Sequence, residues 1–210
     1  MPSNGAQRYR EYAGEIRAAA AYMLDLINNL LDLARIRAGA LDLREEVCDL
    51  DRLIGVTIHM IEPRARTAGV EVVVERSGAL PAVVGDPVLI RQMLTNLIVN
   101  AVKFSAPVGG RVTVATRREA DGTLVVVVRD TGIGMRAEMI PKALSPFLQV
   151  HDLSVVGEKG SGLGLPLTKA LIEQHGGSIA IHSAPGAGTE VRLVFPAARV
   201  GRAGAGPLNS

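Results

Sequence analysis

The sequence is poor in aromatic residues, cysteine and net charge. Tryptophan is absent and aromatic residues make up 3% of the 210 residues, so Val, Leu, Ile and Ala must build the core. Cys48 is the single cysteine, which excludes an internal disulfide and fits a reducing compartment. The net charge is +2 and no block of Lys or Arg is present, which argues against a nucleic-acid partner.

Membrane and export signals are also missing from the sequence. No apolar run approaches the roughly 20 residues that cross a bilayer, and residues 1–4 lack the basic and apolar pattern of a signal peptide. We therefore expect a cytoplasmic protein, with membrane attachment only through a longer parent protein.

Residues 9–37 are predicted to form one long helix, which Gly39 ends. Apolar or small residues recur at steps of three and four, as in a coiled coil: Ala13, Ile16, Ala20, Met23, Ile27, Leu30 and Ala34. Further leucines widen this stripe beyond a two-stranded seam. The pattern predicts a homodimer through this helix, and the alternative is that the helix folds back on the globular part.

After Gly39, strands and helices alternate in mixed order, which predicts an α/β sandwich with a mixed sheet and one helical layer. We expect strands at 41–47, 70–75, 82–84, 111–117, 124–129, 178–183 and 190–195, and helices at 50–66, 87–104, 136–143 and 163–175. The expected parts are a helical segment over residues 1–39, a globular domain over 40–196 and a flexible tail over 197–210.

Three short motifs carry the chemistry. On the helix at 87–104, the spacing of four, four and three puts Gln92, Asn96, Asn100 and Lys103 on one face. An amide oxygen suits Mg²⁺, which takes substrate phosphates as further ligands, and a lysine supplies charge for the same phosphates. The alternative is an ordinary polar surface.

The second motif, residues 130–135, follows an apolar strand. The carboxylate of Asp130 suits an exocyclic amine such as that of adenine, and Gly132 and Gly134 allow close approach of a flat ring; an ordinary turn is the alternative. In the third motif, Gly160, Gly162 and Gly164 lead into a helix, whose free N–H groups favour phosphate. A flexible loop is the alternative there, and the Walker pattern is absent.

Together these motifs resemble the ATP-binding catalytic part of a sensor histidine kinase, in the Bergerat-fold ATPase superfamily. The resemblance covers about residues 41–195: 86–105 is similar to the N box, 130–135 and 160–165 to the two glycine boxes, 146–149 to the F box and 188–189 to a glycine-threonine element. Residues 24–39 look like the second helix of the family's dimerisation hairpin. A response regulator or phosphotransfer protein is the implied partner.

The resemblance implies an ATP and Mg²⁺ site, with Asn100 as metal ligand, Asp130 on the adenine amine and 160–164 in a mobile lid. Asn96, Lys103 and Lys159 are implied in catalysis. The implied nucleotide contacts are Asn96, Asn100, Lys103, Asp130, Gly132, Gly134, Met135, Phe147, Gly160, Ser161, Gly162, Leu163, Gly164, Leu165 and Thr189.

The family's phosphoacceptor histidine has no counterpart among the four histidines. His59 lies inside a helix, His151 in the lid region without the family's flanking residues, and His182 on a strand. His175 ends a helix, where a cation favours the helix dipole. We expect the acceptor to come from a removed upstream segment or another protein, so that the chain is a fragment or a natural short form.

Two other functions remain open at this stage. One is a non-catalytic ATP-binding module that docks a partner through the long helix. The other is a gyrase- or chaperone-type ATPase, which the helix at 87–104 disfavours because it offers no carboxylate as a base. The leading hypothesis is transfer of the γ-phosphoryl group to a histidine outside this chain. In the lid, where relatives often have arginine, Lys159 is the positive charge before the second glycine box.

Overall fold

The computed structural model describes residues 4–76, 78, 80–146 and 161–201, and its contacts divide the chain into two compact units, Met1–Leu41 and Asp42–Ser210. The first unit is α1 (Asn4–Arg37), a single helix of 34 residues. It begins five residues before the expected start at residue 9. Its end is capped as expected, since Gly39 adopts a φ of 65°.

Helix α1 presents large apolar side chains on its surface. Of the residues on the predicted seam, Ile16, Met23, Ile27 and Leu30 have exposed fractions of 69%, 57%, 53% and 47%. Burying such side chains is worth about 1.5–3 kcal/mol each, so this surface favours association with another apolar surface. Within the residues described, no helix combines the length and apolarity that a bilayer crossing requires.

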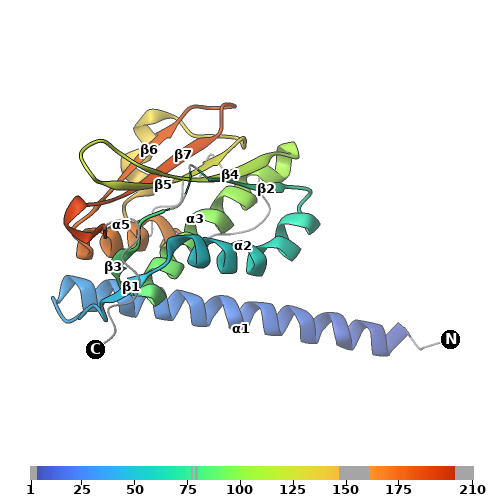
Figure 1. The fold of residues 1–210 in the computed structure, drawn as a ribbon. Coiled ribbons are helices and arrows are strands. Elements are labelled where there is room, and N and C mark those ends of the chain that lie inside the picture. The colour runs from blue at the N-terminus through green and yellow to red at the C-terminus, as the bar shows by residue number, and fades with distance from the viewer. Residues whose placement is uncertain (1–3, 77, 79, 147–160, 202–210) are drawn as a thin grey trace. The chain divides into compact units, whose positions relative to one another are not determined.

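The second unit is built on a five-stranded mixed sheet in the order β2-β4-β5-β7-β6 (Figure 1). The parallel pair is β2 with β4, and the other neighbours are antiparallel. The strands are β2 (Glu71–Arg76), β4 (Arg111–Arg118), β5 (Leu124–Asp130), β6 (Ser178–Ser183) and β7 (Thr189–Phe195). A separate two-stranded sheet pairs β1 (Glu46–Cys48) with β3 (Val83–Gly85).

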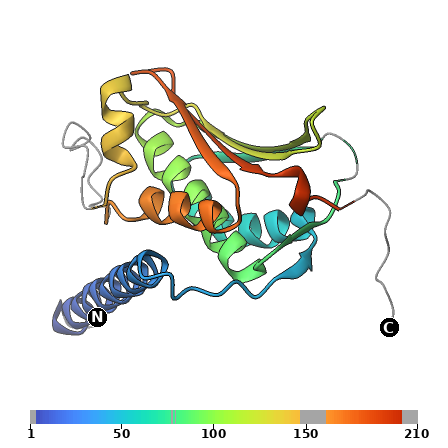
Figure 2. The ribbon, with the colours of Figure 1, turned by 90° about the vertical axis from the view of Figure 1, so that its left-hand side faces the viewer.

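Three helices cover one face of this sheet: α2 (Leu50–Thr67), α3 (Pro87–Ser105) and α5 (Gly164–Gln174) (Figures 1 and 2). Helix α3 is central, because it packs against α2, α5, β4 and β5. Its inner side chains are almost fully buried, and the core is aliphatic as the composition predicts: Ile90, Met93, Leu94, Leu97 and Ile98. The α/β sandwich with one helical layer is confirmed.

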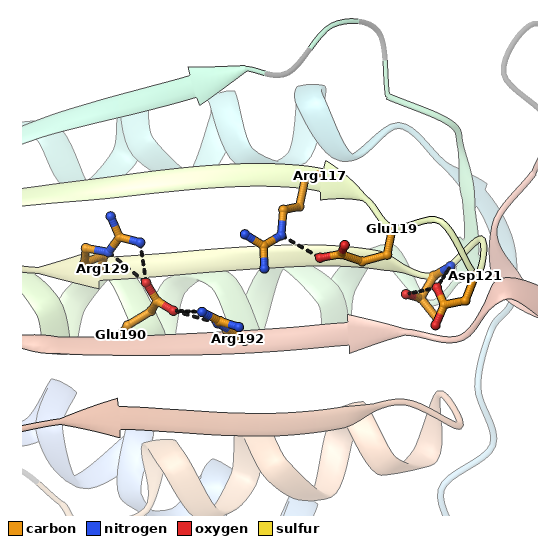
Figure 3. Close-up of polar contacts among 7 residues, drawn as sticks. Arg117, Glu119, Asp121, Arg129, Glu190 and Arg192 are labelled. Atoms are coloured by element: carbon orange, nitrogen blue, oxygen red, sulfur yellow. Dashed lines mark hydrogen bonds and ion pairs between the residues drawn. The ribbon is translucent and has the colours of Figure 1, made fainter.

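The opposite face of the sheet carries ion pairs between neighbouring strands. Glu190 on β7 pairs with Arg129 on β5 and with Arg192 on its own strand (Figure 3). Arg117 and Glu119 pair at the end of β4, and Asp121 accepts hydrogen bonds from Thr123 in the β4–β5 turn. The Arg117–Glu119 pair is exposed on both sides, and such pairs contribute about 0–1 kcal/mol, so it adds little to the stability of the sheet. The Glu190 side chain is 12% exposed and bonds to both arginines.

The expected strand at 41–47 is wrong in its extent, because only Glu46–Cys48 is strand and its partner β3 offers three residues for pairing. The helix expected at 136–143 is divided into a 3₁₀ turn, η2 (Ala137–Met139), and α4 (Ile140–Ala143). Pro141 lies in the first turn of α4, where its missing N–H costs nothing.

The tail does not leave the domain at residue 197. Residues Ala197–Arg199 form the 3₁₀ turn η4, Val200 bridges to Val83, and the Gly201 N–H donates to the Ala82 carbonyl. The Arg199 guanidinium donates to the Val84 carbonyl and to the Glu45 carboxylate. A flexible tail over 197–201 was therefore a wrong expectation, because these contacts fix the segment to β3.

Candidate functional site

The helix that carries the asparagines begins at a well-defined cap. Asp86 is buried, and its Oδ1 accepts hydrogen bonds from the N–H groups of Val88 at 3.0 Å and Leu89 at 3.2 Å. Its Oδ2 accepts from the Arg44 N–H at 3.1 Å. Pro87 occupies the first helical position, where its fixed φ suits a helix start. This local geometry fixes which residues of α3 face the site.

Asn96 and Asn100 lie half-buried on α3, next to the start of α5. The Asn96 Nδ2 donates to the Gly164 carbonyl at 3.4 Å. A Cβ built on Gly164 would lie 3.6 Å from the Asn100 Nδ2 and 3.7 Å from the Asn96 Cγ. The structure thus brings the first and third motifs together, with both amides directly against the glycine.

Lys103 lies about one turn beyond Asn100 on α3 and is half-buried. Its Nζ is 5.4 Å from the centroid of the Phe104 ring, within the range of a cation–π contact. Gln92, the first member of the predicted polar face, is half-buried on the same helix. The shared face of these side chains follows from the helix that the structure shows over Pro87–Ser105.

The second motif begins at the end of β5 with Asp130, whose side chain is 6% exposed. Its Oδ1 accepts hydrogen bonds from the Gly132 N–H at 2.9 Å and the Thr189 N–H at 3.2 Å. Burial raises the pKa of the Asp130 carboxyl, although these two bonds oppose the rise. Among the described residues both bonds reach Oδ1, so Oδ2 retains its capacity to accept a bond from a ligand.

The glycines of this motif are required by the protein's own backbone. A Cβ on Gly132 would lie 2.3 Å from the Phe104 carbonyl oxygen. Gly134 and Gly188 have φ values of 62° and 75°, and a Cβ there would lie 1.9 Å from the carbonyl oxygens of Ala184 and Asp130, respectively. Glycine was expected at positions 132 and 134 to let a flat ring approach, but the direct reason is that the protein's own backbone packs against both positions.

The β6–β7 hairpin holds the second motif in place. The Met135 N–H donates to the Ser183 Oγ at 2.9 Å, and that hydroxyl lies 2.9 Å from the Thr189 Oγ1. The Gly186 N–H donates to the Ile133 carbonyl at 2.7 Å. Thr189 and Met135 therefore share one polar cluster. Ser183 was not among the residues expected from the sequence, although it pairs with Thr189 directly beside the turn of the hairpin.

The third motif is described from Ser161 onward. The Ser161 Oγ accepts from the Leu163 N–H at 3.2 Å, Leu163 is buried, and Gly162 adopts a φ of 67°. Helix α5 begins at Gly164, and Leu165 is half-buried in its first turn. The remaining residues assigned to the site from the sequence lie outside the described residues: Phe147, Lys159 and Gly160.

His175 is a neutral buried residue, so the expected cation at the end of α5 was wrong. It is fully buried, its Nδ1 lies 2.8 Å from the Leu171 carbonyl oxygen, and its Nε2 accepts from the Asp86 N–H at 3.1 Å. Burial lowers the pKa of the imidazole. An imidazole that accepts at one nitrogen is the neutral tautomer, and a charge here would lose that bond.

A metal at this site would have little help from charged side chains. Within the described residues, no group of three or more His, Cys, Asp or Glu side chains is arranged to hold a metal ion. Mg²⁺ fits such a site, because it is commonly held by few protein oxygens together with substrate phosphates and water. The Asn100 amide is a donor of the required kind.

The sandwich fold and the meeting of an asparagine face with a glycine-rich helix start define a class of ATPase domain. Residues 85–199 match the family described as Histidine kinase-, DNA gyrase B-, and HSP90-like ATPase. Because this match covers more than half of the chain, the protein belongs to that family.

Curated relatives are histidine kinases by name. The chain is 43% identical over 206 residues to the Cell-division control histidine kinase PdhS of Brucella canis, covering 93% of this chain and 20% of the relative. It is 42% identical over 204 residues to PdhS of Brucella abortus, with the same coverage. The chain therefore spans about a fifth of the length of these relatives.

Solved structures agree on the fold. Full-length ShkA in complex with AMPPNP superposes with a TM-score of 0.78 at 29% identity, over 89% of this chain and 38% of that one. The mycobacterial sensor histidine kinase MprB superposes with a TM-score of 0.62 at 27% identity, over 72% of this chain and 97% of that one. The histidine kinase ThkA in complex with the response regulator TrrA, at 20% identity and a TM-score of 0.70, supports the fold alone.

Proposed function

We propose that this chain binds Mg-ATP as the catalytic domain of a two-component sensor histidine kinase and donates the γ-phosphoryl group to a histidine outside this chain. The observation that carries the proposal is the contact of Asn96 and Asn100 with Gly164. It joins an amide face to the N-terminus of α5, 68 residues away. Backbone N–H groups at a helix start favour phosphate, and amide oxygens suit Mg²⁺.

The described residues divide between the two ends of the nucleotide. The Asp130 Oδ2 accepts a hydrogen bond from the adenine amine, and the adenine wall is Gly132, Gly134, Met135 and Thr189. Asn96, Lys103 and residues 161–165 face the phosphates, and Asn100 binds Mg²⁺, which neutralises phosphate charge when bound. Phe147, Lys159 and Gly160, assigned to the site from the sequence, lie outside the described residues.

The absence of an acid on α3 favours transfer to histidine over hydrolysis. The sequence of α3 contains no Asp or Glu, so the helix supplies no base to activate a water. A neutral imidazole nitrogen already has a free lone pair. It attacks the γ-phosphorus, the bond to the β-phosphate oxygen breaks, and ADP leaves, while the Lys103 ammonium stabilises charge on the transferring group.

Binding is tested by titrating the chain with ATP with and without Mg²⁺ and measuring heat. Asn100→Asp is expected to alter the magnesium dependence of binding, because a carboxylate replaces the proposed amide ligand. Thr95→Ala is the matched control on the same helix, since the Thr95 hydroxyl bonds to the Arg91 carbonyl of its own helix. Unchanged binding and magnesium dependence in Asn100→Asp would exclude Asn100 as the ligand.

Transfer is tested with γ-labelled ATP and a supplied hairpin that carries an acceptor histidine. Acid-labile label on the hairpin supports the kinase. The apolar surface of α1 favours a second candidate, a non-catalytic module that docks a partner and binds ATP without transferring phosphate. Binding without label on the hairpin supports that alternative, and release of free phosphate without a hairpin supports a hydrolytic ATPase.

We further propose that α1 pairs with a second copy of itself and that the phosphorylated histidine serves a response regulator or phosphotransfer protein. The exposed Ile16, Met23, Ile27 and Leu30 motivate the pairing. The complex of ThkA with its response regulator TrrA motivates the partner.

A further inference from the structure

Helices α3 and α5 meet at two polar contacts that lie far apart along each helix. One joins Asn96 to the Gly164 carbonyl, and the other joins the Asp86 N–H to the His175 Nε2. The two contacts are ten positions apart on the α3 side (96 − 86) and eleven positions apart on the α5 side (175 − 164). The two helices are therefore antiparallel, and at about 1.5 Å per residue both contacts are separated by roughly 15 Å on each helix.

Between the two contacts most buried side chains are apolar, and the buried Thr168 hydroxyl donates within α5 to the Gly164 carbonyl. Ile90 and Leu94 on α3 and Leu167 and Leu171 on α5 are almost fully buried. Burial of apolar surface is non-directional, whereas a hydrogen bond restricts both distance and angle. Interlocking side chains limit how far the helices slide, and the polar contacts at the ends restrict the remaining freedom in distance and angle.

The His175 ring is held on several sides. Its Nδ1 bonds to the Leu171 carbonyl. Its plane lies edge to face with the Phe195 ring at a centroid distance of 6.3 Å. The ring also packs closely on Gly85, because a Cβ at that position would lie 2.8 Å from the His175 Cδ2. A ring restrained in this way presents its Nε2 in one position. The Asp86 N–H that meets it belongs to the residue that caps α3.

We propose that His175 is a positioning residue for the ATP site: by accepting the Asp86 N–H it sets the register of α5 along α3 and so places Gly164 against Asn96 and Asn100. The proposal rests on the ATP-binding function proposed above. The imidazole is fully buried, so in this proposal it acts only through the two helices.

Two substitutions separate the register from general stability. His175→Gln keeps an acceptor near the position of Nε2, whereas His175→Asn keeps a polar group near Nδ1 and loses the partner of the Asp86 N–H. We expect His175→Gln to bind Mg-ATP within about threefold of the unaltered chain and His175→Asn to bind about five- to tenfold more weakly, as for one lost hydrogen bond. Gly85→Ala displaces the unaltered ring and is expected to weaken binding as His175→Asn does.

The control is Val114→Ala, which removes buried methyl groups from β4 and takes part in neither of the two polar contacts between α3 and α5. Stability is followed by urea unfolding, and the folded proteins are compared by the ¹H–¹⁵N resonance of the Asn96 side-chain amide. This resonance is expected to shift in His175→Asn and Gly85→Ala and to stay in place in His175→Gln and Val114→Ala.

The proposal is overturned if folded His175→Asn and Gly85→Ala keep the unaltered affinity and amide resonance. Equal losses in His175→Gln and His175→Asn, or an equal loss in Val114→Ala, overturn it as well. If the unaltered chain binds no Mg-ATP, the proposed function fails, while the amide resonance still decides whether His175 sets the register.

Discussion

Asp130 offers the sharpest test of the site, because its two carboxylate oxygens have different partners. Oδ1 accepts from two backbone N–H groups, those of Gly132 and Thr189. In Asp130→Asn, these two donors require the amide oxygen to remain at the Oδ1 position. The amide NH₂ then occupies the Oδ2 position and faces the adenine amine with a second donor.

The two consequences of Asp130→Asn differ in size. Its free energy of unfolding is expected to change by less than about 1 kcal/mol, since both backbone bonds keep an acceptor. Its Mg-ATP affinity is expected to fall about 10- to 150-fold, which corresponds to about 1.5–3 kcal/mol for a hydrogen bond to a charged group.

Asp130→Ala removes both acceptors and leaves two buried N–H groups unpaired. Each unpaired N–H group costs about 1–3 kcal/mol, so the two together cost about 2–6 kcal/mol. The substitution also removes the cost of burying the carboxyl, whose pKa burial raises, so we expect a loss of stability in the lower half of that range. For a domain of this size the unfolding temperature is expected to fall by about 4–16 °C.

Calorimetric titration with Mg-ATP and thermal unfolding measure the two effects separately. Asp130→Asn with unchanged affinity refutes the adenine role of Oδ2. Asp130→Ala with the stability of Asp130→Asn refutes the anchoring of the two N–H groups by Oδ1.

Four further outcomes are expected. Gly188→Ala loses more unfolding free energy in urea than Gly186→Ala, because both have positive φ but only the former meets a carbonyl oxygen; equal losses contradict this. Burial lowers the pKa of His175 in the folded chain, so as the pH falls the unfolded chain is protonated before the folded one. The urea midpoint is therefore expected to be highest above about pH 6.5 and to fall below it; a midpoint that does not depend on pH through His175 contradicts this. Cys48 is buried, which raises the pKa of its thiol, so it reacts slowly with a thiol reagent until urea unfolds the chain. A chain without residues 1–41 sediments as a monomer, whereas the full chain sediments as a dimer. If both sediment with the same number of chains per particle, pairing through α1 is contradicted.

Elements with local signals could be predicted from the sequence. The Asp86-Pro87 pair gives a cap and a first-turn proline in consecutive positions, and α3 begins at Pro87 as expected. The strands β4, β5, β6 and β7 agree with their expected bounds to within one residue, because each is an apolar or alternating segment between turn residues. Such signals lie within a few positions of the element that they define.

Features that depend on distant partners could not be predicted in the same way. His175 receives its hydrogen bond from a residue 89 positions away, so its burial and neutral state had no local signal, and the helix-end rule suggested a cation instead. Likewise, residues 197–201 are held by β3, although their composition is that of a loose tail. Within the site, the types of side chain could be predicted from the sequence. The contact of Asn96 with Gly164 could not, because it is a tertiary contact.

The last turn of α3 explains how the two ends of the candidate site are joined. The final carbonyls of a helix lack partners within it. Here the Phe104 carbonyl accepts from the Ile133 N–H of the glycine motif at 3.2 Å, and the Ser105 carbonyl accepts from the Gly110 N–H at 3.3 Å. The proposed adenine wall is thus attached to the end of the helix that carries Asn100 and Lys103. Because a side chain at Gly132 would strike the same Phe104 carbonyl, this attachment admits little displacement between the glycine motif and the end of α3. It would therefore hold the proposed base and phosphate ends of the site at a fixed separation.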